Sequence, residues 1–486
     1  MTEGARRAQP PRHGVAALAA VGVLGAFSAW WRIDRSDWKL DEDAYAQAGW
    51  VLVHQGIDPN LGHPPLAKLL FGVSQVVLGR NLTAVRTVSA IGVLVAMAVL
   101  FAFGRMVAGW WTGVAAAGLY AVLPRGMVVS GLHVADLRID RYGMLEAVAA
   151  PLLVAGLWVG WRWIVRGGAR AAAGAGALVG LAGAAKLNAL AVLVPVAVVG
   201  AAFCWRRRHL GRDLALLVAA AVAGFVVPFL WFGRRAWAQL DQTLRFPAER
   251  AKGGHLLVLG HDVYDRSPWW ANLRYTWDAD GPILVAAVLV GLGLAVASRR
   301  RPAVAYLLAA LATLVLTAMA SPVALPHYRQ IWVPVLVLLL AIGVVEPIEQ
   351  LLARRSAGER SGLGVRTVAA GVVAAVLVVA GVVVVVRTAT LGDGDYRTMA
   401  ARAAADGVRP RRILVYGEAV APYFPGAVDA LAPFDDGSQP AQMVVLDPSL
   451  TDAVSPDTVA TWRSWARAWG LQPHHVGRLE AWWAGP

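Results

Sequence analysis

The segment "NLGHPPLAKLL" (residues 60–70) places two prolines, a histidine and a lysine within a chain that is mostly apolar. Proline lacks the backbone N–H that a helix interior requires, so Pro64 and Pro65 predict a break in the chain. A proline suits the first turn of a helix, which predicts an amphipathic helix directly behind Pro65. The rigid corner would fix the directions in which His63 and Lys68 project, as a shared binding site requires.

The composition of the chain is that of an integral membrane protein. Of its 486 residues, 58% are hydrophobic and 16% are charged, and the mean hydropathy is +0.54. About a quarter of the residues of a soluble protein are charged. The formal net charge of +14 comes from arginines that cluster in short loops between apolar segments. This pattern sets the orientation of a membrane protein and does not indicate a nucleic-acid partner.

Apolar segments long enough to cross a bilayer, about 20 residues each, recur along the chain. Lys186 and Asn188 divide one long apolar stretch, because a single helix of that length would exceed the bilayer thickness of about 30 Å. The first segment follows a basic N-terminus without a clear cleavage site, which indicates a signal anchor. About eleven membrane helices are expected, at residues 14–31, 82–104, 107–124, 141–163, 171–186, 188–204, 213–232, 281–298, 302–320, 329–346 and 366–387.

The basic clusters predict the orientation of these helices. With the division at Lys186, all of them fall on the side of the N-terminus, which the positive-inside rule assigns to the cytoplasm. The Ala-, Gly-, Val- and Arg-rich composition suits a GC-rich bacterium, so we expect the plasma membrane. The opposite, extracytoplasmic face then receives three large pieces, at residues 32–81, 233–280 and 388–486.

The last of these pieces differs in character from the rest of the chain. "RILVY" (412–416) and "MVVLD" (443–447) are typical of buried parallel strands, and residues 455–472 form an amphipathic helical pattern. We therefore expect a transmembrane domain over residues 1–387 and a small extracytoplasmic α/β domain over 388–486. The single cysteine, Cys204, provides no intrachain disulfide, so the small domain depends on its own core. Its sequence indicates a packing or acceptor-docking module.

An acidic cluster begins the first of these outer loops. Asp41, Glu42 and Asp43 precede the amphipathic pattern "AYAQAGWVLVHQG" (44–56), which predicts a short helix on the membrane surface. Acidic side chains stabilise the N-terminus of a helix, so the cluster has a structural interpretation as a cap. The alternative is that one of these carboxylates acts as a catalytic base at the membrane surface.

The acidic pair and "HPPLAKLL" (63–70) together resemble the first loop of protein O-mannosyltransferases. They are similar also to the wider set of polyprenyl-phosphate-sugar-dependent transferases with the GT-C fold, which includes the aminoarabinose transferases of lipid A. The resemblance implies a mostly α-helical, GT-C-like transmembrane domain with amphipathic helices in its first outer loop. It covers residues 14–346 and leaves the tail aside.

Other segments extend the resemblance. "LRIDRYGMLEAV" (137–148) resembles an Arg-x-x-Asp-type segment of the family, with Arg138 and Asp140 in place. "GLAGAAKLN" (180–188) resembles a Gly-rich helix that ends in Thr-Lys, with alanine in place of the threonine before Lys186. "GHDVYDRSPWWANLRYTW" (260–277) and "HYRQIWVP" (327–334) are similar to outer segments of the family, the second with altered order and spacing.

The resemblance implies an inverting transfer of a sugar, mannose first, from a polyprenyl phosphate to an acceptor hydroxyl. A carboxylate must take the proton of that hydroxyl, and Asp41 is the first candidate base, with Glu42 second. Basic side chains would stabilise the leaving phosphate. The candidates are Arg138, Lys186, Arg274 and Arg329 for the donor phosphate, and His63, Lys68, Asp140 and His261 for substrate.

Several alternatives stay open from the sequence. Arg138 could pair only with Asp140, and Lys186 could extend only to the interface. His63, His255, His261 and Asp262 could hold a divalent metal, although no tight ligand spacing is present. The acceptor could be a protein Ser or Thr, a glycolipid or a cell-wall glycan, and the sugar could differ from mannose. A transporter or flippase of lipid-linked sugars, which would show inverted repeats, and a membrane scaffold are the other classes.

Overall fold

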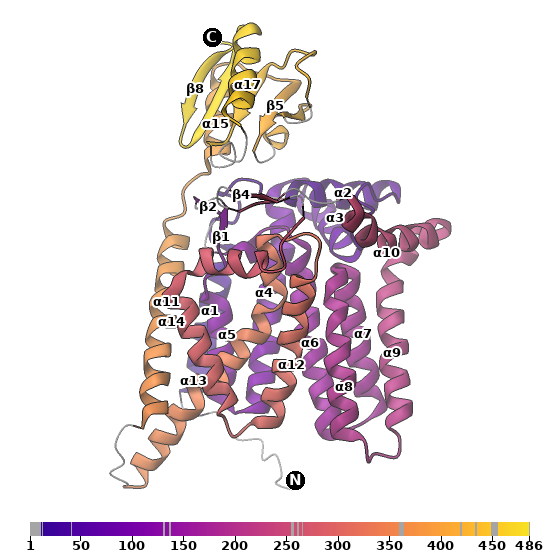
Figure 1. Cartoon of the computed structure of the whole chain (residues 1–486), viewed down its shortest axis with the longest axis vertical. Helices are drawn as coiled ribbons and strands as arrows, with labels where there is room; N and C mark the ends of the chain where they lie inside the picture. Colours follow the sequence, from indigo (N-terminus) through magenta and orange to yellow (C-terminus); the bar gives the residue numbers. More distant parts are fainter. Residues whose placement is uncertain are drawn as a thin grey trace.

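The computed structural model describes residues 11, 13–39, 41–129, 132–135, 138–253, 257–259, 262–264, 266–358, 364–417, 420–432, 435–448 and 455–485. It consists of an upright helical bundle, a layer of short helices across one end of the bundle, and a small domain beyond that layer (Figure 1). The chain is therefore mostly α-helical with a C-terminal sheet domain, as the sequence predicts.

Within the described residues, eight helices are long and apolar enough to cross a membrane. Each predicted span overlaps a helix of the bundle, although α1, α5 and α7 fall short of the length expected for a span. Helices α8 and α9 reach that length only together with the adjoining turns Leu187–Val192 and Val227–Arg235. The bundle helices are α1 (Gly14–Trp30), α4 (Leu82–Val107), α5 (Trp110–Val122), α6 (Leu145–Arg166), α7 (Ala169–Ala185), α8 (Leu193–Cys204), α9 (Leu210–Val226), α11 (Ala271–Val296), α12 (Arg301–Met319), α13 (Val333–Ser356) and α14 (Val365–Ala389).

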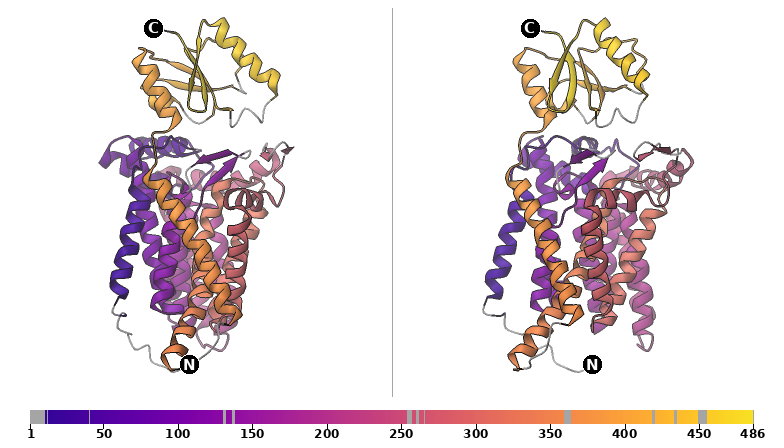
Figure 2. Two further views of the ribbon diagram at one scale, coloured as in Figure 1. Left: turned by 90° about the vertical axis from the view of Figure 1, so that its left-hand side faces the viewer. Right: turned by 60° about the vertical axis from the view of Figure 1, so that its left-hand side comes forward.

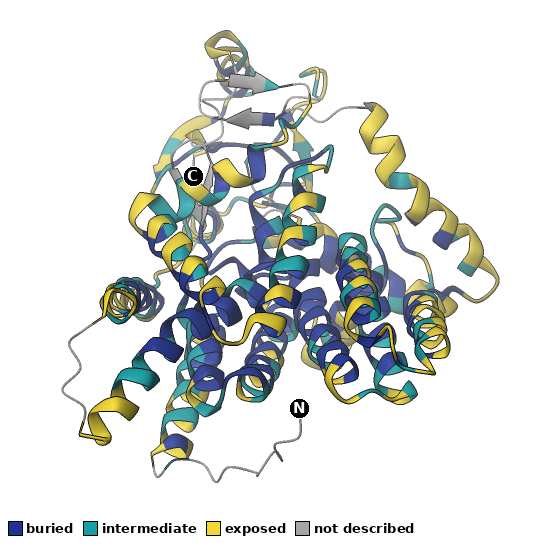
Figure 3. Cartoon of the chain, turned by 60° about the horizontal axis from the view of Figure 1, so that its bottom comes forward, coloured by how far each residue is buried: buried dark blue, intermediate teal, exposed yellow. Residues whose placement is uncertain are grey.

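The two ends of the bundle differ in what they carry. The beginning of α1 and the α8–α9 connection lie at the lower end, whereas the short helices and the C-terminal domain lie at the upper end (Figure 1). Seen from the lower end, buried residues occupy the centre of the bundle and exposed ones its periphery (Figure 3). The arginine clusters at residues 161–170 and 205–213 join helices at this lower end, so they fall together as predicted.

The layer at the upper end consists of α2 (Glu42–Gln55), α3 (Leu66–Leu78) and α10 (Ala236–Gly253), which lie across the bundle (Figure 1). The chain turns into α10 through η3 (Val227–Arg235), where Gly233 adopts a positive φ of 54°. Helices α2 and α3 confirm the two amphipathic helices predicted on either side of the proline corner. Short segments complete the layer: the hairpins β1 (Met127–Val129) with β2 (Leu132–Ala135) and β3 (Leu257–Leu259) with β4 (Asp262–Tyr264), and the 3-10 turns η1 (Ile139–Arg141), η2 (Leu187–Val192) and η4 (Pro326–Ile331).

Helix α11 contains a break that explains where its membrane span begins. Gly281 has φ 73° and ψ 166°, outside the helical region, and Pro282 follows it. Glycine adopts a positive φ at low cost, and proline cannot donate the backbone hydrogen bond of a continuous helix. The polar first part of α11 therefore separates from the apolar part, at the residue where the sequence predicts the span to start.

The C-terminal domain is a five-stranded sheet with the strand order β6-β5-β7-β9-β8. The predicted strands β5 and β7 are parallel neighbours, and the predicted amphipathic helix is α17, whose first turn is capped by Ser455. The domain appears above the end of α14 in both further views (Figure 2). Its elements are α15 (Asp395–Ala405), β5 (Arg412–Tyr416), η5 (Ala421–Tyr423), β6 (Val428–Leu431), β7 (Met443–Leu446), α17 (Pro456–Ala468), β8 (Gln472–Val476) and β9 (Leu479–Trp483).

Two cores hold this domain together, one on each face of the sheet. Ile413 and Val415 of β5 pack in the same core as Tyr396 of α15. Leu414, between them, packs in the other core with Trp462 of α17. Because side chains alternate along a strand, a continuous apolar strand fills both cores at once.

Helices α7 and α9 approach each other closely because their contact is lined with small residues. A Cβ on Gly180 would lie 2.1 Å from the backbone oxygen of Ala221, and one on Gly176 would lie 2.0 Å from that of Leu217. Small residues allow such backbone approach between membrane helices. The Gly-rich sequence of α7 thus has a packing cause, and the contact fixes the height at which α7 ends before Lys186.

We predict that Gly180→Ala destabilises the protein because its new methyl group meets a backbone oxygen that cannot rotate away. Overpacking of this kind costs about 1–3 kcal/mol. The matched control is Gly174→Ala in the same helix, where the nearest atom, on Val159, is an ordinary 3.5 Å away. Thermal unfolding of the purified proteins in detergent tests this, and equal melting temperatures for the two variants would contradict it.

Candidate active site

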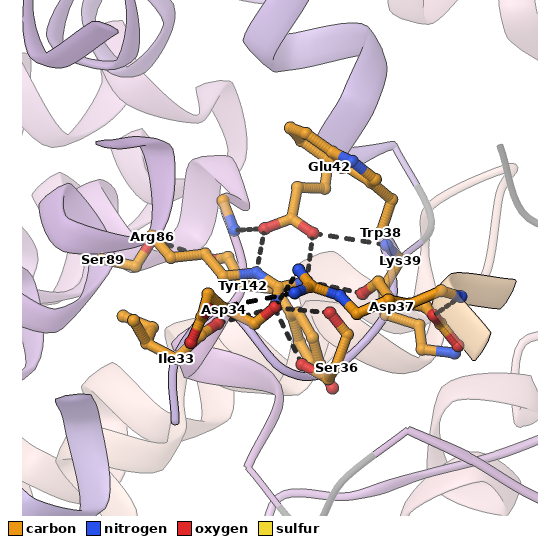
Figure 4. Close-up of polar contacts among 12 residues, drawn as sticks. Ile33, Asp34, Ser36, Asp37, Trp38, Lys39, Glu42, Arg86, Ser89 and Tyr142 are labelled. Atoms are coloured by element: carbon orange, nitrogen blue, oxygen red, sulfur yellow. Dashed lines mark hydrogen bonds and ion pairs between the residues drawn. The ribbon is translucent and has the colours of Figure 1, made fainter. Parts of the chain in front are cut away.

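Glu42, at the start of α2, forms a buried ion pair with Arg86 of α4 (Figure 4). Arg86 donates from Nε to Oε1 of Glu42 at 2.8 Å and from a terminal nitrogen to Oε2 at 2.7 Å. Glu42 also accepts from the backbone N–H of Gly143 at 2.6 Å and of Lys39 at 3.3 Å. The carboxylate is fully buried and its acceptor positions are occupied, so we assign Glu42 a structural role rather than that of a base.

The remaining donors of Arg86 hold the segment that leads into α2. They reach the backbone oxygens of Ile33 at 2.8 Å and Asp37 at 2.6 Å, and both oxygens of Ser36 at 2.8 and 3.1 Å. The guanidinium also lies over the ring of Tyr142, 4.6 Å from its centroid. One side chain of α4 therefore fixes the loop after α1, the start of α2 and the turn before α6.

Asp41, the residue before Glu42, points elsewhere. It occupies the N-cap position of α2, yet its side chain makes no capping hydrogen bond. It accepts instead from the hydroxyl of Tyr45 at 3.2 Å, and Asp41 is exposed while Tyr45 is buried. The capping interpretation of the acidic cluster therefore does not account for Asp41, whose carboxylate is accessible at the edge of a buried site.

A buried polar cluster is formed by α6, the α7–η2 junction and η4. Nζ of Lys186 is 2.8 Å from Oε1 of Glu146, and Nε2 of His327 is 3.6 Å from the same oxygen. Nζ of Lys186 also lies 4.9 Å from the ring centroid of Tyr328. Lys186, Glu146 and His327 are buried, so the interactions among them are weakly screened by solvent.

Electrostatic interactions join Asp41 to this cluster. Burial lowers the pKa of His327, and the negative charges of Glu146 and Asp41 act in the opposite direction. Burial likewise raises the pKa of Tyr328, where Lys186 opposes and the two carboxylates reinforce the shift. The charge of Asp41 also acts on Lys186, as the smallest of the contributions to its pKa. The two residues are thus within electrostatic range of each other, without an ion pair between them among the described residues.

Several polar atoms of this region are buried without a hydrogen-bond partner among the described residues. They include both ring nitrogens of His327, both side-chain polar atoms of Gln330 and Oδ1 of Asn188. A buried polar group without a partner costs about 1–3 kcal/mol. Buried polar groups of this kind are satisfied by ordered water or by a polar ligand.

The proline corner separates the two basic side chains it was predicted to orient. His63 lies edge-on to the ring of Tyr45, with centroids 5.6 Å apart, and faces the cluster. Burial, followed by the charges of Lys186 and Lys68, lowers its pKa well below its usual range. Lys68 is turned away and buried, where it pairs with Asp58 and donates to the backbone oxygens of Asn60 and His63, the last at 2.7 Å. Lys68 therefore holds the corner in shape.

Arg138 and Asp140 form a separate buried network. Arg138 donates to both oxygens of Asp140, at 2.8 and 2.6 Å, and Arg125 lies 3.1 Å from the same carboxylate. Arg138 and Arg125 also donate to the backbone oxygens of Ala121 and Tyr120 at the end of α5. These contacts support the alternative in which Arg138 pairs with Asp140 and closes a helix end.

The other predicted residues are dispersed. Arg274 forms an exposed i,i+4 pair with Asp278 at 2.9 Å. Arg329 is buried, pairs with Asp280 at 2.8 Å and donates to the backbone oxygen of Gly126 at 2.9 Å, which joins η4 to α11. His261 lies outside the described residues. The structure therefore brings Asp41, His63 and Lys186 together and gives Arg274 and Arg329 other partners.

In the part of the chain that the structure describes, no three His, Cys, Asp or Glu side chains are close enough together to hold a metal ion. His255 and His261, two of the four residues considered for a metal, are outside that part. His63 faces aromatic rings, those of Tyr45 and Phe246.

Sequence analysis missed four residues of the site. Glu146, His327 and Tyr328 contact Lys186 or one another, and Arg250 of α10 acts electrostatically on His63 and Tyr328. Glu146 carried a usable signal, because a carboxylate in an apolar helix is costly in a bilayer and is usually functional. The others follow from tertiary contacts between distant segments.

Comparison with known proteins concerns the family and the fold of the chain. Residues 62–232 match the model of the family "Dolichyl-phosphate-mannose-protein mannosyltransferase". No curated protein sequence matches the chain. Among solved structures, apo ArnT from Cupriavidus metallidurans matches with a TM-score of 0.59 and 16% identity over 97% of this chain and 98% of that one. The same protein bound to undecaprenyl phosphate gives 0.62 and 15%, over 98% and 100%.

The chain has the GT-C fold. The archaeal oligosaccharyltransferase AglB from Archaeoglobus fulgidus, in complex with an inhibitory peptide and a dolichol-phosphate, also matches, with a TM-score of 0.53 and 12% identity over 90% of this chain and 69% of that one. The predicted resemblance to membrane glycosyltransferases of this fold is therefore confirmed. At sequence identities of 12–16%, these matches show that the chain shares the fold of those proteins.

We predict that Glu42→Gln loses folded protein rather than only activity. Removing one partner of a buried pair typically costs about 3–5 kcal/mol, since Arg86 would keep its charge without the opposing carboxylate. The readout is the yield and melting temperature of the purified variant.

The control for Glu42→Gln is Arg274→Gln, which breaks the exposed pair with Asp278. Exposed pairs contribute about 0–1 kcal/mol, so this variant keeps its melting temperature. A Glu42→Gln protein that melts like wild type but transfers no substrate would contradict the structural assignment.

Proposed function

We propose that the protein is a membrane glycosyltransferase that moves a sugar from a polyprenyl phosphate to an acceptor hydroxyl at the upper end of the bundle. The observation that carries the proposal is an accessible carboxylate, Asp41, within electrostatic range of a buried polar cluster that contains Lys186, Glu146 and His327. The GT-C fold and the family match over residues 62–232 support it. A scaffold would not need this combination of groups.

In the proposed reaction, Asp41 accepts the proton of the acceptor hydroxyl as its oxygen attacks the anomeric carbon. The bond from that carbon to the phosphate oxygen breaks, and the lipid phosphate leaves with the bonding electrons. Attack opposite the leaving group inverts the anomeric configuration. The hydrogen bond from Tyr45 at 3.2 Å holds the Asp41 carboxylate in one direction while leaving its other oxygen free to act.

The departing phosphate would be held by Lys186, with Arg250 of α10 as a second cation. A fixed positive charge in a poorly screened site stabilises negative charge that develops in the transition state. Glu146 keeps Lys186 in place through the 2.8 Å contact, and both ring nitrogens of His327 are buried without a hydrogen-bond partner among the described residues. A lipid phosphate at the end of the bundle would reach this cluster without leaving the bilayer interface.

Mannose is the proposed sugar because the matching family model describes mannosyl transfer from a lipid phosphate. The acceptor would be a Ser or Thr of an exported protein, or a glycan or lipid. A second candidate is the transfer of a different sugar to a glycolipid or a cell-wall polysaccharide. It is favoured by the matches to ArnT, which cover nearly the whole chain, whereas the family model covers residues 62–232.

We also propose that the upper end faces the outside of the plasma membrane and that the N-terminus is cytoplasmic. The support is the gathering of arginine-rich turns at the lower end, which the positive-inside rule assigns to the cytoplasm. Residues 388–486 would then form an extracytoplasmic domain above a transmembrane domain of residues 1–387.

We predict that Asp41→Asn abolishes sugar transfer without unfolding the protein. Loss of a general base typically costs about 10²–10⁴-fold in rate, and this exposed side chain contributes no helix cap. The assay is transfer from radiolabelled polyprenyl-phosphate mannose, and from other polyprenyl-phosphate sugars, to a panel of acceptors in reconstituted membranes.

The control for Asp41→Asn is Asp43→Asn, two residues along the same helix. Asp43 accepts from Gln47 at 2.9 Å, outside the cluster, and burial raises its pKa to about 6. Its amide variant should retain the wild-type rate to within about twofold. Unchanged transfer by Asp41→Asn, or an equal loss in Asp43→Asn, would remove Asp41 as the base.

We predict that the double variant Glu146→Gln with Lys186→Gln stays folded but binds the lipid phosphate weakly. Replacing both members of a buried pair avoids an unpaired charge, so the fold should survive. Without the Lys186 charge we expect the affinity for the lipid phosphate to fall about tenfold, which corresponds to about 1.4 kcal/mol of binding free energy. Titration with undecaprenyl phosphate measures the effect. The control is Lys252→Gln, an exposed lysine of α10, and equal affinity of both variants would contradict the assignment.

A further inference from the structure

The C-terminal domain makes specific contacts with the segment that carries the candidate base. Asp37, in the loop between α1 and α2, accepts from the backbone N–H groups of Tyr396 at 3.2 Å and Arg397 at 2.9 Å, in the first turn of α15. Tyr423 of η5 donates its hydroxyl to the same carboxylate at 3.2 Å and accepts from the N–H of Trp38 at 3.1 Å. A carboxylate from the transmembrane part thus caps a helix of the tail.

Asp37 is at the same time part of the network around Glu42. Its side chain is almost fully buried, and its backbone oxygen accepts from Arg86 at 2.6 Å. Arg86 in turn holds Glu42, which directly follows Asp41 in the chain. A continuous series of polar contacts therefore runs from the first turn of α15 through Asp37 and Arg86 to the start of α2.

The contact between the tail and Asp37 leaves no space for a side chain at Gly394. A Cβ placed on Gly394 would lie 2.2 Å from the carboxylate carbon of Asp37. Gly394 has φ −68° and ψ 157°, a conformation that any residue adopts, so its small size is what the contact requires. The N–H of Gly394 also donates to the backbone oxygen of Arg35 at 3.0 Å.

Other contacts of the same interface are exposed or only partly buried, as is the hydrogen bond from Arg397 to the backbone oxygen of Asp34. Arg35 pairs with Asp393 at 2.9 Å, and both side chains are more than two-fifths exposed. Exposed pairs contribute little to stability. Within the described residues, the buried component of the interface therefore centres on Asp37 and the first turn of α15.

We propose that the C-terminal domain is a positioning element of the candidate active site, and that Asp37 is the residue through which it orders the segment that carries Asp41. The inference rests on the proposed function, because Asp41 is the proposed base. The tail would hold residues 31–39 from above while Arg86 holds them from below. Separation of α15 from Asp37 would loosen the start of α2 and misplace the Asp41 carboxylate.

The first experiment compares Gly394→Ala with Gly392→Ala in the full-length protein. A Cβ on Gly392 meets nothing within 4 Å, so this variant changes the same linker without touching Asp37. Gly394→Ala should lower kcat at least about tenfold with the donor KM within about twofold of wild type, because the tail acts on positioning and not on donor binding. Asp37→Asn, paired with Asp393→Asn as its control, provides a second test with an isosteric change.

A second measurement does not depend on activity. Hydrogen exchange of the backbone amides of Trp38 and Lys39 should be faster in Gly394→Ala than in Gly392→Ala, because both donate hydrogen bonds within the network. If no donor supports transfer by the wild-type protein, the proposed function fails, whereas this difference in exchange still tests the coupling.

Two results would overturn the proposal. Equal exchange and equal kcat in the two glycine variants would show that the tail does not order the segment. A loss confined to the acceptor KM would instead identify the tail as an acceptor-binding module.

Discussion

The buried pair of Glu42 and Arg86 is the constraint on which the candidate site depends. A charge pair sequestered from water is stable only when nearly every donor and acceptor is satisfied. Here the guanidinium meets that requirement by bonding to three backbone oxygens and a serine, in addition to the carboxylate. The result is that segments distant in sequence, the loop after α1, the start of α2 and the turn before α6, take one arrangement around α4. That arrangement fixes the position of Asp41, because Asp41 directly precedes Glu42 in the chain.

Much of the fold could be predicted because the bilayer imposes a strong rule on the sequence. Each spanning segment must be apolar over about 20 residues, so the segments and the division at Lys186 were visible. In the tail, β5 and β7 were visible for a different reason: a strand buried on both faces of a sheet is apolar throughout. By contrast, β6 (Val428–Leu431) and β8 (Gln472–Val476) lie at the edges of the sheet, and their mixed polarity carries no clear pattern.

The candidate site was only partly predictable. Adjacency in sequence cannot tell which of Asp41 and Glu42 faces inward, because the answer depends on Arg86, which lies 44 residues beyond Glu42. Lys68 was predicted to bind substrate because no sequence pattern marks Asp58, ten residues earlier, as its partner. The structure shows the two paired and buried. The pairing of Arg138 could be predicted, because its partner Asp140 follows two residues later. The cluster around Glu146 needed three distant segments to come together, which local patterns do not report.

Helix α3 has a consequence for how a lipid would enter. One side of it is buried through Lys68, while Leu70, Val73 and Val76 expose apolar side chains along the other. A helix with such a face lies in the boundary between headgroups and acyl chains. On this basis we propose that the corner that begins α3 lies at the depth of the lipid headgroups. A polyprenyl phosphate at that depth could diffuse laterally to the site while its hydrocarbon chain stays among the other lipids. Withdrawing the chain from the bilayer would cost about 0.8 kcal/mol for each methylene group, and this cost would not add to the barrier for binding.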